Sequence, residues 1–335
     1  MRKEILILEL REQKFLENKN LMLAFMEKGC RAKYDYHIHT VRSDGFFTLE
    51  EVIKFAHIAG LKRIIITDHN EIMSVKKDLE SIPKDVLGEL EVFVGCEIAC
   101  KYFDEKYGKY ISIEVVYFGK EVEEVQKFID NSNIKNKENQ ITSFEFLKEQ
   151  FRKNGLVFDE NITMPKDMYA TEFLARELLK HPENKAFFDR THPIVWTSPK
   201  LFYKKFCIDP ESDFYIDTTT NLPTVQEVAE FCESIGGITI VAHPGLYIYR
   251  TNEEIKRFLD GVFKISKVKG IETDHSSHSF EQREFLYEYA KANGLKVSGG
   301  TDFHSGPQTV IAFGKAECPL QINDESFEWV TEIYK

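Results

Sequence analysis

Short apolar segments alternate with amphipathic ones along most of this chain. Seven of the apolar segments are rich in β-branched and aromatic residues, as strands are: 34–39, 62–67, 90–99, 110–119, 237–243, 269–273 and 294–301. Most are separated by segments with helical spacing, and the first of these starts at a capping box, Thr48 to Glu51, and ends at Gly60. The alternation predicts an α/β fold with a parallel sheet of about seven strands.

This pattern is interrupted between residues 121 and 223, where the sequence becomes helical and polar. Such a segment is too long for a loop, so we expect a helical insertion subdomain that acts as a lid. The predicted organisation is an N-terminal helical extension over 1–32, a main domain over 33–120 and 224–320, the insertion over 121–223 and a C-terminal segment over 321–335.

Histidines and acids gather at the ends of the predicted strands. His37 and His39 close the first strand, and Asp302 and His304 follow the last one at the same spacing, which puts two side chains on one face. Five more candidates lie at or near other strand ends: Asp44, His69, Glu97, Glu114 and His243. Because chemistry spread over many strand ends favours a barrel over an open sheet, we expect a TIM-like (β/α) barrel.

These residue types point to metal ions. Imidazole nitrogens mixed with carboxylate oxygens suit zinc, manganese or iron. Nine candidate ligands exceed the needs of one ion, so we expect two or three divalent ions close together. Such centres suit phosphate ester hydrolysis, because they generate hydroxide near neutral pH and neutralise the phosphoryl oxygens.

Six motifs follow one another in a specific order: YDYHIHT at 34–40, SDG at 43–45, TDHN at 67–70, GCE at 95–97, AHPG at 242–245 and GTDFH at 300–304. Between about Tyr34 and Gly306 the chain thereby resembles the polymerase and histidinol phosphatase (PHP) family, in particular its small-molecule or nucleotide phosphoesterase branch. The resemblance implies a distorted seven-stranded β/α barrel with an insertion and a two- or three-metal phosphoesterase centre.

The resemblance also implies how the ligands are shared. A first ion would be held by His37, His39, Glu97 and Asp302, a second by Glu97 and His243, and a third by Asp44, His69 and His304. Glu114 stands where the family usually has histidine and would replace it at the second ion, which favours manganese or iron over zinc. The alternative for Glu114 is a strand-edge or salt-bridged carboxylate.

Other residues are candidates for substrate contact and for orienting ligands. The resemblance places His278 near the substrate phosphate as a donor or as the acid for the leaving oxygen, with Asp302 as a further catalytic residue and His275 as a second candidate for the donor. A polar loop that caps the next helix is the alternative for both histidines. Asp35 and Asp68 would accept a ring N–H from a ligand, or else be solvated loop acids.

The insertion is where we expect substrate selection. Relatives often carry an arginine and a histidine where this chain has Thr171 and Phe173, so their basic phosphate clamp is in doubt here. Arg176 and Arg250 are the predicted substitutes, with Arg190 as a further one, and a solvated or helix-pairing arginine is the alternative for each. Surface or capping roles are expected for His57, His181 and His192.

The composition limits which partners the protein can bind and where in the cell we expect it. With 44 Lys and Arg against 55 Asp and Glu, the net charge is −11, which argues against binding long nucleic acid. No secretory signal or membrane span is visible and the six cysteines are scattered, so we expect a cytoplasmic protein with reduced thiols and no membrane partner. The N-terminal helix is a candidate for forming an oligomer.

We therefore expect a metal-dependent phosphoesterase that hydrolyses a small phosphomonoester through a metal-activated hydroxide. A nucleotide or a short oligonucleotide end is the alternative substrate. An amidohydrolase on the same barrel type and a noncatalytic metal-binding module are the alternative classes, and the SDG and AHPG motifs fit the phosphoesterase better.

Overall fold

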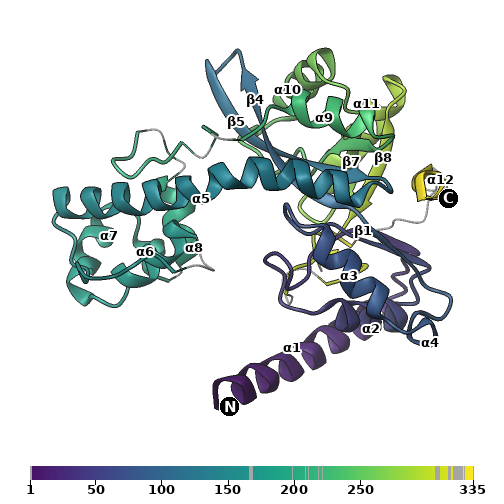
Figure 1. Cartoon of the computed structure of the whole chain (residues 1–335), viewed down its shortest axis with the longest axis horizontal. Helices are drawn as coiled ribbons and strands as arrows, with labels where there is room; N and C mark the ends of the chain where they lie inside the picture. The colour runs from purple at the N-terminus through teal and green to yellow at the C-terminus, as the bar shows by residue number, and fades with distance from the viewer. Residues whose placement is uncertain are drawn as a thin grey trace. The chain divides into compact units, whose positions relative to one another are not determined.

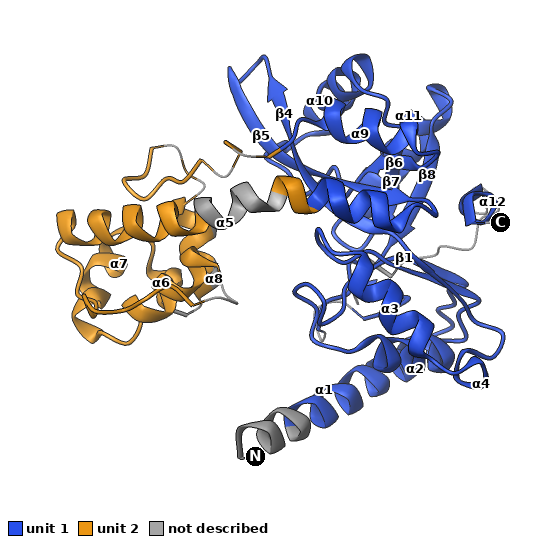
Figure 2. Cartoon of the chain, viewed as in Figure 1, with its two compact units in different colours: residues 1–129, 223–335 blue, residues 130–222 orange. Residues whose placement is uncertain are grey.

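The computed structural model describes residues 2–165, 169–197, 199–207, 209, 211–217, 219–220, 222–305, 310–315, 318–319, 327 and 329–334. The chain divides into two compact units (Figure 2), which are Met1–Ile129 with Pro223–Lys335, called unit 1, and Asp130–Leu222, called unit 2. Unit 2 lies inside the segment expected to be an insertion. Of the expected C-terminal segment, residues 321–326, 328 and 335 lie outside the described residues.

Unit 1 contains a parallel sheet of three strands (Figure 1), β1 (Tyr34–Ile38), β2 (Arg63–Ile66) and β3 (Glu91–Val94), in that order. Every residue of β1 and β2 is buried. Continuous burial is the state expected of parallel strands that are covered on both faces.

A second sheet has five strands in the order β4 (Cys96–Asp104), β5 (Lys109–Phe118), β6 (Ile238–Val241), β7 (Gly270–His275) and β8 (Lys296–Gly300). The pairs β6–β7 and β7–β8 are parallel, but β4–β5 and β5–β6 are antiparallel. The expectation of a wholly parallel sheet was therefore wrong. Only residues 105–108 join β4 to β5, and Gly108 has a φ of +62°, so the chain makes a hairpin where a parallel crossover would need a dozen or more residues.

The mixed α/β character is confirmed. The strands lie in sheets of three and five, which does not confirm one seven-stranded barrel. The segment 90–99, expected to be one strand, is divided at Gly95 into β3 and β4, which belong to different sheets. Isolated parallel bridges link Ile38 to Phe303 and His69 to Glu97. The two sheets thus meet at the strand ends where the candidate ligands lie.

Helices α1 (Arg2–Glu27), α2 (Leu49–Ala59), α3 (Met73–Ser81), α4 (Lys84–Leu87), α9 (Val225–Ser234), α10 (Asn252–Ile265), α11 (Phe280–Ala292) and α12 (Trp329–Tyr334) belong to unit 1, with the short strands β9 (Gly314–Lys315) and β10 (Cys318–Pro319). The expected capping box is confirmed, since Thr48 and Glu51 each bond the other's backbone N–H. Helix α1 packs on α2 through the stacked rings of Phe15 and Phe55, whose centroids are 4.4 Å apart.

Unit 2 is helical. It takes the C-terminal part of α5 (Val122–Lys153) together with α6 (Ala170–Leu178), α7 (Lys185–Thr191), α8 (Pro199–Phe202) and short 3-10 or π turns at Pro182–Asn184, Pro193–Thr197 and Tyr203–Cys207. Its core is separate from that of unit 1 and is built on aromatic rings: Phe151, Phe188, Phe202, Phe206 and Phe214. None of the described helices has the length and apolar character needed to cross a membrane.

Candidate metal centre

The first two candidate ligands, His37 and His39, lie at the C-terminal end of β1. His37 lies within β1 and His39 directly after it, and both side chains are fully buried. Their i, i+2 spacing turns both imidazoles the same way, so the two Nε2 atoms are 3.1 Å apart. Gly300 of β8 has no room for a side chain, because a Cβ there would lie 2.4 Å from the His37 backbone.

Glu97 and Asp302 complete a group around these imidazoles. Glu97 Oε2 is 3.1 Å from His37 Nε2 and 3.3 Å from His39 Nε2. Asp302 Oδ1 is 3.7 Å and 3.2 Å from the same two nitrogens. The four ligand atoms lie within 4.8 Å of one another, as one ion requires.

Glu97 also faces a second set of side chains. Its Oε1 is 2.7 Å from His243 Nε2, while its Oε2 is 3.2 Å from His69 Nδ1. Glu114 closes this set, with its two oxygens 3.5 Å from His69 Nδ1 and 3.4 Å from His243 Nε2. The carboxylate of Glu97 therefore lies between two groups, where a bridging ligand would have to be.

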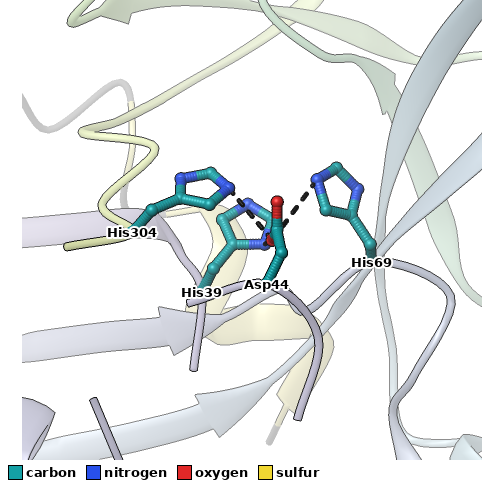
Figure 3. Close-up of side chains that lie close together, drawn as sticks. All are labelled: His39, Asp44, His69 and His304. Carbon is teal, nitrogen blue, oxygen red and sulfur yellow. Dashed lines mark ion pairs between the residues drawn. The ribbon is translucent and has the colours of Figure 1, made fainter. Parts of the chain in front are cut away.

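A third group is shown in Figure 3, where His39, His69 and His304 surround Asp44. Asp44 Oδ1 is 3.1 Å from His304 Nε2, 3.7 Å from His39 Nδ1 and 3.9 Å from His69 Nε2. The turn that presents Asp44 passes so close to His39 that a Cβ on Gly45 would lie 2.5 Å from its carbonyl. All nine predicted ligands thus come together, although their roles as ligands stay a prediction.

Asp35 and Asp68 hold the backbone that carries the ligands. Asp68 accepts hydrogen bonds from the backbone and hydroxyl groups of Thr40 and Ser43, and so fixes the loop that ends in Asp44. Asp35 likewise accepts from Thr301, next to Asp302. Both acids are fully buried. The two roles expected for them, acceptors of a ring N–H or solvated acids, were therefore wrong.

Glu272 is the residue that sequence reasoning missed. It is fully buried on β7, its Oε1 lies 2.8 Å from His37 Nδ1, and its Oε2 accepts the backbone N–H of His243 at 2.8 Å. A carboxylate that accepts the free ring N–H of a ligand fixes the tautomer and orientation of that ligand. The available signal was a charged residue inside the apolar strand segment 269–273.

The donor set fits divalent ions. With the Glu272 carboxylate as acceptor, the neutral ring of His37 carries its proton on Nδ1 and turns the lone pair of Nε2 toward the other candidate ligands. That lone pair faces the nitrogen of His39 and the oxygen of Glu97, both 3.1 Å away. Three lone pairs that converge in a buried place repel one another unless a cation or a proton lies between them.

The pKa values of the side chains, with no ion bound, also show that the site needs positive charge. Burial alone lowers the pKa of His39, but its contacts with Asp302 and Glu97 raise the pKa to about 10. For His243, burial also lowers the pKa, and the charge of Glu97 raises it to about 9. Burial and the neighbouring charge of Glu97 raise the pKa of Glu114. The site thus gathers positive charge around its carboxylates, which divalent ions would supply instead.

Two ligand positions have a backbone that L-residues seldom adopt. Asp302 has a φ of +55° and His243 a φ of +23°. Such conformations cost free energy and persist where the surrounding structure enforces them, which is common at functional sites. Here they aim a side chain into the centre from the end of a strand.

The two further histidines after β7 differ in what their ring nitrogens do. His278 Nδ1 lies 3.1 Å from Thr273 O, and its Nε2 accepts the Gly245 backbone N–H at 3.1 Å, so both nitrogens face backbone groups. His275 Nδ1 accepts the Ser277 N–H, whereas its buried Nε2 has no hydrogen-bond partner among the described residues and lies 3.8 Å from Asp302 Oδ2. Burial lowers the pKa of both rings, that of His278 to about 4.

The arginines predicted to contact the substrate are divided between the two units, with Arg176 and Arg190 in unit 2 and Arg250 in unit 1. Arg176 in unit 2 donates two hydrogen bonds to Glu172 on its own helix, as a helix-pairing residue does. Arg250 is exposed in the chain after His243, and Arg190 bonds the carbonyl of Ala186. The substrate contacts of Arg176, Arg250, His275 and His278 stay predictions.

Comparison with known proteins gives matches in family, sequence and structure. The PHP domain model matches residues 35–174. A 5′-3′ exoribonuclease of Haemophilus influenzae is 24% identical over 274 residues, 81% of this chain and 90% of its own length. A 3′,5′-nucleoside bisphosphate phosphatase of Chromobacterium violaceum is 29% identical over 82 residues, 24% of this chain and 28% of its own.

Two solved structures share the fold. One, from Bifidobacterium adolescentis, is inferred to be a metal-dependent phosphoesterase, and it matches with a TM-score of 0.58 and 22% identity over 90% of this chain and 94% of its own. The other is an amidohydrolase of Chromobacterium violaceum with bound sulfate and no metal, at a TM-score of 0.60 and 18% identity over 86% and 94% of the two chains. Residues 35–174 therefore match the PHP domain, and the family resemblance that the motifs predict is confirmed.

Proposed function

We propose that the protein is a metal-dependent phosphoesterase that hydrolyses a small phosphomonoester at a centre of two or three divalent ions. The observation that supports this most is the position of Glu97, whose two oxygens face separate sets of imidazoles, at 2.7 Å from His243 and 3.1 Å from His37. A carboxylate shared in this way is what closely spaced ions need.

The ligands divide into three sets. A first ion would be held by His37, His39, Glu97 and Asp302, a second by Glu97, Glu114 and His243, and a third by Asp44, His69 and His304. When bound, manganese, zinc or iron ions lower the pKa of water and neutralise the phosphoryl oxygens. Carboxylates at Glu114 and Glu97 favour manganese or iron.

His275 is the residue best suited to donate a proton or a hydrogen bond to the substrate. Because Nδ1 accepts the Ser277 N–H, the neutral ring carries its proton on Nε2. Burial lowers the pKa of His275, so the ring stays neutral at pH 7. Its N–H is aimed at the region beside Asp302 Oδ2, 3.8 Å away. A phosphoryl or leaving oxygen there would satisfy a buried donor that has no partner among the described residues.

A nucleotide or a short oligonucleotide end is the second candidate substrate. It is favoured by the exoribonuclease of Haemophilus influenzae, which aligns with 81% of this chain. The likeness to the amidohydrolase concerns the fold alone at 18% identity. We therefore rank phosphoesters above amides, and an enzyme above a noncatalytic metal-binding module.

The test is phosphate release from sugar phosphates, histidinol phosphate and nucleoside 5′- and 3′-phosphates with added manganese or zinc. We expect turnover by the wild type and its collapse in His39→Ala and Asp302→Ala. His57→Ala is the matched control, because His57 is exposed and bonds the carbonyl of Val86. Ring opening of cyclic amides without phosphate release would replace the proposal by the amidohydrolase.

A further inference from the structure

The candidate centre is most open on the side of its third group. Asp44, with 47% of its side chain exposed, is the most exposed of the nine candidate ligands, while His37, His39 and Glu97 are fully buried. His304 and His69 beside it are 28% and 25% exposed. A substrate that enters here meets the chain that follows Asp44 and His304.

Helix α1 lies against this side of the centre. Phe46 lies two residues after Asp44, and its backbone N–H donates to the carbonyl of His304 at 2.8 Å, so the backbone of Phe46 lies beside the third group. Lys14 Nζ is 4.3 Å and Arg11 Cζ 6.0 Å from the centre of the Phe46 ring. Asn18, one turn further along α1, lies with its Nδ2 3.5 Å from the carbonyl of Ser305.

Neither of these cations has an acidic partner among the residues that the structure describes. Among the described residues no carboxylate lies within 4.0 Å of Arg11 or Lys14, and Arg11 Nε is buried without a hydrogen-bond partner. Arg42, also close in sequence to Asp44, differs, because its guanidinium forms two hydrogen bonds with Asp78. Two unpaired cations held over one aromatic ring are ready to receive an anion.

We propose that Arg11 and Lys14 bind a second phosphate of the substrate, one that is not hydrolysed. A guanidinium and an ammonium together suit a phosphate dianion. This rests on the proposed function and defines its substrate class as a phosphoester with a further phosphate, either a nucleoside bisphosphate or a short oligonucleotide. Helix α1 precedes the matched PHP domain at 35–174, so this site would be an addition to that domain.

The test compares adenosine 5′-monophosphate, adenosine 3′,5′-bisphosphate and a 5′-phosphorylated diadenylate as substrates. The variant is Arg11→Gln with Lys14→Met, which removes both charges and keeps side chains that cover Phe46. Lys28→Met is the control, because Lys28 follows the end of α1, about 20 Å along the helix from Lys14. A variant with Arg11→Lys and Lys14→Arg keeps the charge.

We expect the charge-removing variant to lose about tenfold in kcat/KM, through KM, on a substrate with two phosphates. Its slope of log kcat/KM against log salt becomes shallower by about 1. Adenosine 5′-monophosphate, the control and the charge-keeping variant should change less than twofold. A loss confined to the bisphosphate or to the diadenylate identifies which of the two is the substrate, and a loss on both supports the shared second phosphate.

Equal losses on all three substrates, or no loss on any, would overturn the inference while leaving the proposed function standing. If the metal-loaded wild type hydrolyses none of them, the proposed function fails for nucleotides. Calorimetric binding of adenosine 3′,5′-bisphosphate then decides the inference separately. Binding tenfold tighter by the wild type than by the charge-removing variant supports it, and equal binding contradicts it.

Discussion

Charged and ionisable residues are used in opposite ways in the two units. In the candidate metal centre of unit 1 most of them are buried and pair across long stretches of chain, as Glu97 does with His243. In unit 2 several pairs instead join neighbouring turns of a single helix, as Arg176 does with Glu172 on α6 and Lys185 with Asp189 on α7. Buried ionisable groups cost stability unless something compensates them, so unit 1 carries the features of chemistry and unit 2 those of a folded scaffold.

The largest effect is expected at the residue that joins the ligand groups. Glu97→Gln should lower kcat/KM about a thousandfold or more and remove at least one bound ion, because an amide is a poor ligand between imidazoles. Metal content and phosphate release measure this. Glu89→Gln is the control, since Glu89 is exposed. If the Glu97→Gln variant binds as many ions as the wild type, Glu97 is not a metal ligand.

A core substitution in unit 2 should affect stability alone. Phe151 is fully buried among the aromatic rings of that unit, so Phe151→Ala should lower the free energy of unfolding of unit 2 by about 3–5 kcal/mol. Denaturant unfolding measures this, with the exposed Ile141→Ala as the control. At low temperature, where the variant stays folded, its metal content should equal that of the wild type. A loss of metal would show that metal binding in unit 1 depends on the stability of unit 2.

Glu272→Gln tests whether the centre depends on its supporting residues. The glutamine amide can turn its NH2 group toward His37 Nδ1, and this group cannot accept the ring N–H. The His37 ring then loses the contact that fixes its orientation. We expect a loss of metal affinity of about 10- to 100-fold with an unchanged fold, measured by competition with a metal indicator. Glu272→Asp should recover part of the affinity, whereas equal affinity in all three proteins would mean that Glu272 is only structural.

Glu114→His should change the choice of metal more than the rate. The histidine restores the residue usual in the family and makes the second group richer in nitrogen, so the ratio of zinc to manganese affinity should rise about tenfold. Paired titrations of the wild type and the variant measure that ratio. An unchanged ratio would favour the alternative, in which Glu114 is a strand-edge acid.

The sequence predicted which side chains come together better than it predicted the fold around them. Ligand spacing is local, so two residues such as His37 and His39 at i, i+2 could be placed on one face of a strand from the sequence alone. The break at Gly95 and the antiparallel hairpin of β4 and β5 could not, because strand direction depends on how the chain pairs over long distances.

Glu272, Asp35 and Asp68 show a second limit. Their importance comes from burial and from partners elsewhere in the chain, such as His37 for Glu272 and Thr301 for Asp35. A single sequence shows the acid but not its partner. The same holds for Arg11 and Lys14. In the sequence they are ordinary charged residues of a helix, and only the structure shows them over the ring of Phe46.

The most direct test of the multi-ion centre is a crystal structure of the manganese- or zinc-loaded protein with anomalous scattering at the metal edge. Two or three anomalous peaks are expected, with donor atoms about 2.0–2.3 Å from the ions. The carboxylate of Glu97 should contact two of these ions. Metal analysis of the same sample should give the same number of ions per chain. A single peak, or peaks away from Glu97, would contradict the multi-ion centre.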